Sequence, residues 1–161
     1  MKSVAGVRCA KKANVDLGAW KTGQRFPKSA LNLRGPYPIP TGWTWRQIKF
    51  SADGENYTIV LKFRKERHDF MAMLVHSGEP DTVLCRLEHH GSHAGWHIHY
   101  QCERPFIQGA ANFPTLRVRE CDQDTKFTDL MLFDFEAWAM TFAASAFGLR
   151  EKLSDDFGEL L

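Results

Sequence analysis

The chain has 161 residues, of which 43% are hydrophobic and 25% are charged, and its formal net charge is +2. This composition is that of one globular domain with a real core, too large to depend on disulfide staples. It contains no apolar run of about eighteen residues and no secretory signal at its N-terminus, so we expect a soluble cytoplasmic protein without a membrane partner.

The first 42 residues are expected to form an irregular basic arm. They show no sustained periodicity, and RGPYPIPTG at 34–42 brings three prolines and two glycines together, which leaves at most a short helix around Lys28 to Leu33. Residues 1–50 hold ten Lys or Arg against one acid, whereas residues 120–161 hold three against ten. This polarity suggests contact with a polyanion, pairing of the two ends of the chain, or simply a solvated surface.

Residues 43–120 are expected to form an antiparallel sheet. Tyr57, Ile59, Leu61 and Phe63 alternate with polar residues after an Asp53-Gly54 turn, which is typical of a β-hairpin. The expected strands are Trp43 to Ala52, Tyr57 to Arg64, Phe70 to His76, Thr82 to His89, Gly95 to Cys102, and Thr115 to Glu120. Short turns between successive strands indicate a β-meander.

One long helix is expected near the C-terminus, over 128–148. Thr128 is a suitable N-cap, Gly148 a suitable stop, and the apolar residues between them must pack on the sheet. An acidic tail follows over 149–161. The fold class is therefore α+β: a single domain, 1–161, with an antiparallel β-meander of five or six strands and one long C-terminal helix packed on one face, leaving the other face free for a ligand.

A histidine-rich hairpin follows Leu87, where five of the seven histidines fall within eleven residues. Strand alternation assigns two sets to opposite faces: Val83, Cys85, Leu87 and His89 toward the helix, and Leu84, Arg86, Glu88 and His90 away from it. If this strand pairs with the next, Arg86, Glu88 and His90 lie across from His97, His99 and Gln101. The connecting loop brings His93 to the rim.

This hairpin suggests general acid/base cleavage of RNA without a metal. Imidazoles titrate near neutral pH, so we predict His97 and His99 as acid and base, oriented by Glu88 and accompanied by His90 and His93. Cations are needed for the phosphate, and the candidates are Arg86, Arg104, Lys62 and Arg64. His68, His76 and His89 are more readily explained as structural residues.

The rival prediction is a metal site. His97 and His99 are two residues apart on one strand face, a usual spacing for a two-histidine chelate of Zn, Ni or Fe, and Glu103 or Glu88 would complete the set. The text from Gly91 to Gly109 also resembles the first motif of the cupins. No histidine follows His99, however, so the second cupin motif has no counterpart here.

A further resemblance is one of layout. The loop and strand GSHAGWHIHY, followed by KFTDLMLFDFEAW, resemble the TumE-type toxins of bacterial toxin-antitoxin pairs over about half of the chain. The resemblance implies a small RNA-degrading toxin, restrained by a helix-turn-helix antitoxin partner, and carries over His97, His99 and the loop glycines. The basic arm and the Glu88-His89-His90 run depart from that family.

Three functions therefore remain open. The first is a metal-independent ribonuclease with RNA as its partner. The second is a metal-binding protein or metalloenzyme that uses His97, His99 and Glu103. The third is a module without catalysis, in which the basic arm binds nucleic acid or an acidic protein and the histidine hairpin is structural.

Overall fold

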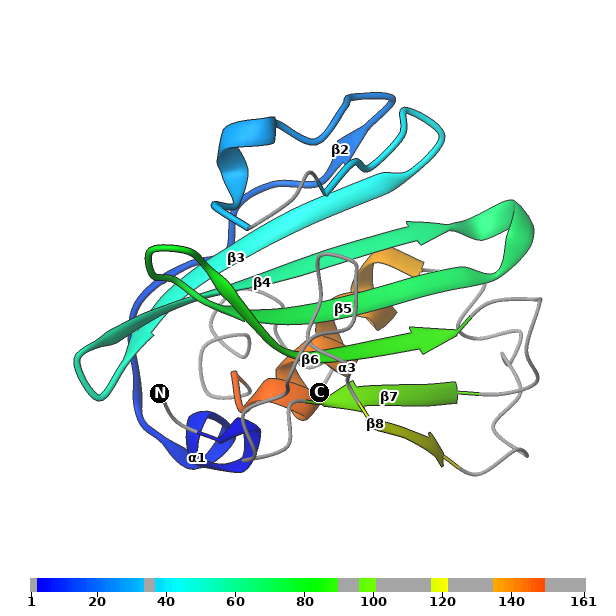
Figure 1. The fold of residues 1–161 in the computed structure, drawn as a ribbon. Helices are drawn as coiled ribbons and strands as arrows, with labels where there is room; N and C mark the ends of the chain where they lie inside the picture. The colour runs from blue at the N-terminus through cyan, green and yellow to red at the C-terminus, as the bar shows by residue number, and fades with distance from the viewer. Residues whose placement is uncertain (1–2, 34–36, 90–95, 101–116, 122–134, 150–161) are drawn as a thin grey trace.

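The computed structural model describes residues 3–33, 37–89, 96–100, 117–121 and 135–149 (Figure 1). For 96–100 and 117–121 it describes the backbone and its pairing. The elements are α1 (Val4–Cys9), β1 (Lys12–Asp16), β2 (Lys21–Thr22), η1 (Lys28–Ala30), β3 (Thr44–Ala52), β4 (Glu55–Arg64), η2 (Lys65–Arg67), β5 (Asp69–His76), β6 (Thr82–His89), β7 (Trp96–Tyr100), β8 (Arg117–Cys121) and α3 (Phe135–Phe147).

The described strands form one antiparallel sheet in the order β1-β3-β4-β5-β6-β7-β8, with β2 also paired to β3. Strands β3 to β8 are the predicted meander, and the α+β class is confirmed. The β3–β4 turn has positive φ at Asp53 (49°) and Gly54 (81°), which is the backbone that an Asp-Gly hairpin turn requires.

Helix α3 is shorter than predicted. It spans Phe135–Phe147, and the predicted N-cap at Thr128 lies outside the described residues. Its end agrees with the prediction, since Gly148 follows in the left-handed conformation with φ +73°. No helix within the described residues is both long and apolar enough to cross a membrane.

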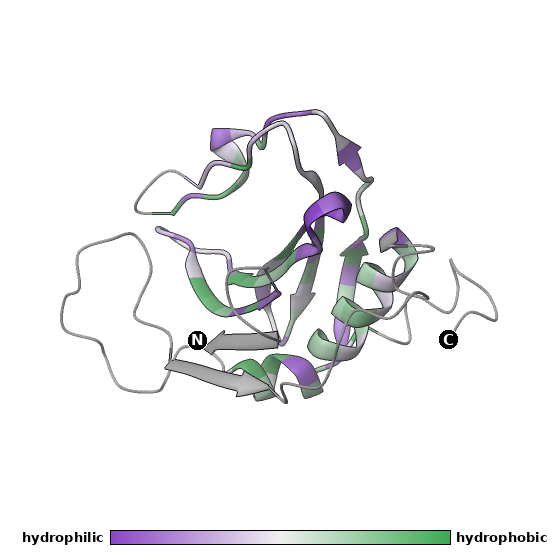
Figure 2. Ribbon diagram, turned by 90° about the vertical axis from the view of Figure 1, so that its right-hand side faces the viewer, coloured by the Kyte–Doolittle hydropathy of each residue, from purple (hydrophilic) through white to green (hydrophobic). Residues whose placement is uncertain are grey.

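One side of the sheet, here called the helix face, packs against α1 and α3, which Figure 1 shows behind and below the strands. The helices contribute Val7 from α1 and Ala139, Met140, Ala143, Ala144 and Phe147 from α3. The central strands contribute Ile59, Leu61, Phe70, Ala72 and Leu74, all almost fully buried. Figure 2 shows the same distribution, with hydrophobic segments on the central strands and on α3.

The opposite side, here called the arm face, is not left free, and this part of the prediction was wrong. It carries a second buried cluster in which Trp45, Val60, Met71 and Met73 pack against residues of 26–33 and 37–43. The arm contributes Phe26, Leu31 and Ile39, with Ala30, Leu33, Tyr37 and Trp43 at its margin. Strand β5 requires this cover, because it is apolar at successive positions and therefore on both faces.

The arm is also more regular than predicted, since α1, β1 and β2 precede the expected short helix η1. Two buried cations fix its path. The Lys12 ammonium donates to the carbonyls of Val7 (2.6 Å) and Ala10 (2.7 Å) at the end of α1. The Arg46 guanidinium donates to the carbonyls of Leu17 (2.7 Å) and Gly18 (2.8 Å). Hydrophobic periodicity does not reveal such contacts.

A β-bulge in β6 corrects the predicted alternation. Leu74 pairs with Cys85 but Val75 pairs with Val83, so Leu84 is the extra residue. Consequently Leu84 belongs to the helix-face core with Cys85, whereas Val83 belongs to the arm-face core. Beyond the bulge the predicted alternation holds.

Candidate functional site

The candidate site lies on the arm face, where two cross-strand rows of register partners run side by side. The first row joins Lys62 to Met71, Met71 to Glu88, and Glu88 to His97. The second joins Met73 to Arg86 and Arg86 to His99. Register partners belong to the same face of an antiparallel sheet. The predicted pairing of the histidine hairpin is therefore confirmed at the level of the backbone.

Arg86 and Glu88 form an ion pair along β6. The Arg86 Nε lies 2.9 Å from the Glu88 Oε1, and the two side chains are 24% and 16% exposed. Positions two apart in a strand share a face, so the side chain of Arg86 in the second row can reach that of Glu88 in the first. A carboxylate and a guanidinium thus stand one strand away from positions 97 and 99.

Lys62 and Arg64 share a face, as predicted, and both contact one indole ring. The Lys62 Nζ lies 4.4 Å from the centroid of the Trp43 ring, and the Arg64 Cζ lies 4.5 Å from it. The Lys62 Nζ is also 5.2 Å from the centroid of the Tyr37 ring. These are cation–π distances, so the arm supplies an aromatic wall for the cations of β4.

None of these aromatic contacts was predicted from the sequence. Tyr37 lies between prolines in the arm, and its hydroxyl donates to the Met71 Sδ at 3.0 Å. Burial raises the pKa of Tyr37 well above its ordinary value of 10.0. Arg86 lowers this pKa and Glu88 raises it, both by smaller amounts. The only signal in the sequence was an aromatic residue within a proline-rich segment, which gives no long-range partner.

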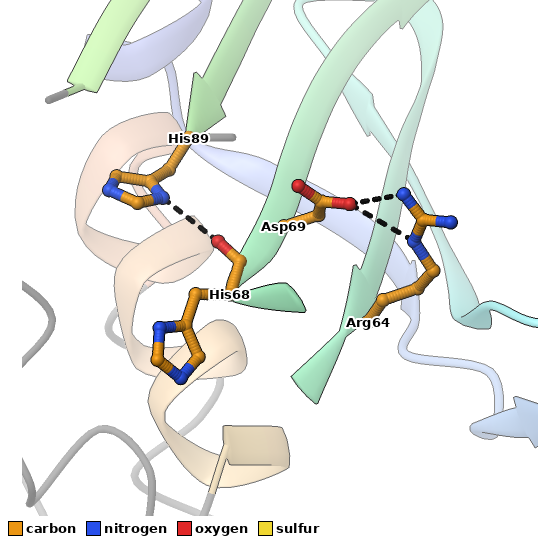
Figure 3. A network of polar contacts seen from close by, with 4 residues as sticks. All are labelled: Arg64, His68, Asp69 and His89. Atoms are coloured by element: carbon orange, nitrogen blue, oxygen red, sulfur yellow. Dashed lines mark hydrogen bonds and ion pairs between the residues drawn. The ribbon is translucent and has the colours of Figure 1, made fainter. Parts of the chain in front are cut away.

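Arg64 is held by Asp69 across the turn between β4 and β5 (Figure 3). Its Nε donates to Asp69 Oδ2 at 3.0 Å, and a second guanidinium nitrogen donates to the same oxygen. The Asp69 residue is buried. This pairing fixes the Arg64 guanidinium beside Asp69, and its role as a phosphate ligand stays a prediction.

The remaining described histidines make structural contacts. Figure 3 shows the His89 ring directed at the backbone of His68, with its Nδ1 2.9 Å from the His68 carbonyl oxygen. His68 ends η2 in the left-handed conformation. His76 lies at the other end of β5, where its Nε2 is 3.4 Å from Glu55 Oε2. These contacts agree with the structural roles expected for them.

Four predicted site residues, His90, His93, Glu103 and Arg104, lie outside the described residues. The metal set that depends on Glu103 therefore stays a prediction. Within the part of the chain that the structure describes, no three His, Cys, Asp or Glu side chains form a group able to hold a metal ion. The structure thus brings together Lys62, Arg86 and Glu88 with the backbone positions of His97 and His99.

Comparison with known proteins returned no match: no family model, no curated protein and no solved structure is significantly similar to the chain. The resemblance to TumE-type toxins stays a prediction.

Proposed function

We propose that the protein is a ribonuclease that cleaves RNA by metal-independent acid/base catalysis, with His97 and His99 as the proton-transfer groups. The register of β6 and β7 is the observation that carries the proposal, because it pairs Glu88 with His97 and Arg86 with His99. A strand pair of this kind supplies two imidazoles, a carboxylate and a guanidinium within one small area of the arm face.

The reaction divides among these groups as follows. One histidine accepts the proton of a ribose 2′-hydroxyl, whose oxygen attacks the adjacent phosphorus. The other histidine donates a proton to the departing 5′-oxygen, and the products are a 2′,3′-cyclic phosphate and a 5′-hydroxyl. Glu88 holds the imidazole of His97 in one orientation, and Arg86 stabilises the charge that develops on the phosphate oxygens.

The test is RNA cleavage in the presence of EDTA. His97→Ala and His99→Ala are each expected to lower kcat/KM by about 10²–10⁴-fold without loss of the folded state. His76→Ala is the matched control, since His76 lies at the far end of β5 among helix-face residues. RNA that carries 2′-deoxyribose at the scissile position should resist cleavage. Full activity of His97→Ala, or activity that EDTA abolishes, contradicts the proposal, and the second result favours a metal site.

The toxin resemblance adds an antitoxin partner to the proposal. Expression of the wild-type chain is then expected to arrest bacterial growth, and His97→Ala is expected to relieve the arrest at an equal protein level. If the wild type and His97→Ala arrest growth equally, the toxicity does not depend on catalysis by His97.

A further inference from the structure

Among the described residues, Lys62 differs from Arg64 and Arg86 in having no ion-pair partner. Arg64 is paired with Asp69 and Arg86 with Glu88, whereas Lys62 forms no ion pair with any carboxylate of the described residues. Its ammonium is instead bounded by the rings of Trp43 and Tyr37 at 4.4 and 5.2 Å. A half-buried ammonium that meets only aromatic rings keeps its capacity to bind an anion.

The surroundings of Lys62 make its charge dependent on pH near neutrality. Burial lowers the pKa of Lys62 to about 8; Glu88 and Asp69 act in the opposite direction, and Arg86 and Arg64 reinforce the decrease. Within the described residues 26–33 and 37–43, the groups that face Lys62 are the phenol of Tyr37, whose own pKa is raised, and the indole of Trp43. Lys62 is therefore charged at neutral pH and becomes neutral as the pH rises past about 8.

The position of Lys62 in its row separates it from the proposed catalytic positions. Met71 and Glu88 stand between Lys62 and His97, so that three strand spacings, or about 14 Å between Cα atoms, separate the two. A single phosphate cannot span that distance. The carboxylate of Glu88 also repels any anion that would lie between them.

We infer that Lys62 forms a separate phosphate subsite, which binds a phosphate flanking the one that is cleaved. The inference rests on the proposed function and deepens it, because it specifies the substrate as a single-stranded RNA long enough to occupy both places. Arg64, which is paired with Asp69 and contacts the Trp43 ring, is then a positioning residue, whereas Arg86 stays with the cleaved phosphate. A dinucleotide, which has no flanking phosphate, does not use the subsite.

The experiment measures binding of a 2′-O-methyl oligoribonucleotide, which cannot be cleaved, as a function of salt concentration. For a single strand each phosphate contact contributes about 0.7 to the slope of log K against log salt. Lys62→Met is expected to lower the slope by about that amount, and Lys62→Arg to preserve it. Lys49→Met is the matched control, because Lys49 is an exposed lysine on the neighbouring strand, paired with Thr58 of β4.

The wild-type protein supplies a second measurement that requires no substitution. Its salt slope is expected to fall by up to about 0.7 between pH 7 and pH 9, because Lys62 loses most of its charge over this range. An unchanged slope in Lys62→Met, or in the wild type at pH 9, overturns the subsite but leaves the proposed ribonuclease intact. Absence of any binding by the wild type overturns both, so the two failures are distinguishable.

Discussion

The two faces of the sheet are both apolar at their centres, but their cations are used differently. On the helix face the buried Lys12 ammonium is fully engaged by backbone carbonyls at the end of α1. On the arm face the Lys62 ammonium meets only aromatic rings, beside two arginine–carboxylate pairs. The comparison separates a cation that stabilises the fold from one that makes no ion pair within the described residues, and it is the reason why the proposed phosphate subsite lies on the arm face.

The largest expected effect tests whether the arm face is a true second core. Leu74 and Met73 are adjacent on β5, are both fully buried, and belong to the helix-face and arm-face cores respectively. Truncation of either to alanine is expected to lower the free energy of unfolding by about 2–5 kcal/mol, because each leaves a cavity. Chemical denaturation of Leu74→Ala and Met73→Ala measures both.

A loss below about 1 kcal/mol in Met73→Ala alone would mean that the arm lies on the sheet without packing into it. The arm face would then be open to a ligand larger than a nucleic-acid strand. The two faces would differ in whether they carry a packed core, and not only in their cations.

The next effect concerns the contact between the two helices of the helix face. Gly148 has φ +73°, and a Cβ at this position would lie 2.1 Å from the Arg8 carbonyl oxygen. Gly148→Ala therefore combines the cost of a left-handed alanine, about 1–2 kcal/mol, with a clash that must push α1 away from α3. We expect a loss of about 2–4 kcal/mol by thermal or chemical unfolding.

Gly23→Ala is the matched control for this substitution. Gly23 has a similar φ of +70°, but a Cβ there would meet nothing within 4 Å. Only the backbone cost of about 1–2 kcal/mol is expected. Equal losses in the two variants would show that α1 yields to the new methyl group without penalty.

A smaller effect compares the two lysines directly. Lys12→Met removes the ammonium donor from three carbonyl groups, one buried and two partly buried, and is expected to cost about 1–3 kcal/mol. Lys62→Met removes no hydrogen bond or ion pair of the described residues, and it removes a charge that burial disfavours, so its stability is expected to be no lower than that of the wild type at neutral pH. Similar losses in both would indicate that Lys62, too, is a structural residue.

Much of the sheet could be predicted because its signals are local. The Asp53-Gly54 turn and the alternation after Tyr57 determine the first hairpin, and short turns determine the next pairings. The register that brings Glu88 opposite His97 follows from the same alternation. The successive apolar residues of β5 need cover on both faces, which the prediction of a free face overlooked, and that pattern does not say which segment provides the cover.

The candidate site could be predicted only in part, because its remaining contacts are long-range or irregular. Tyr37 and Trp43 reach Lys62 through the path of a proline-rich segment, which periodicity does not describe. The bulge at Leu84 exchanges the faces predicted for Val83 and Leu84, and no Gly or Pro marks it in the sequence. The Arg64–Asp69 pair depends on how tightly β4 turns into β5, and it changes the charge available to a ligand.

The last prediction is a pH dependence of stability that arises from Lys62. Its pKa is lowered from 10.5 to about 8 in the folded protein, so between these values the unfolded chain binds more protons than the folded one. The free energy of unfolding of the wild type relative to Lys62→Met should therefore rise from about pH 8 to about pH 10.5. Paired denaturation curves across this range measure the difference. A constant difference would mean that Lys62 stays solvated in the folded protein, and the contrast between the two faces would then rest on geometry alone.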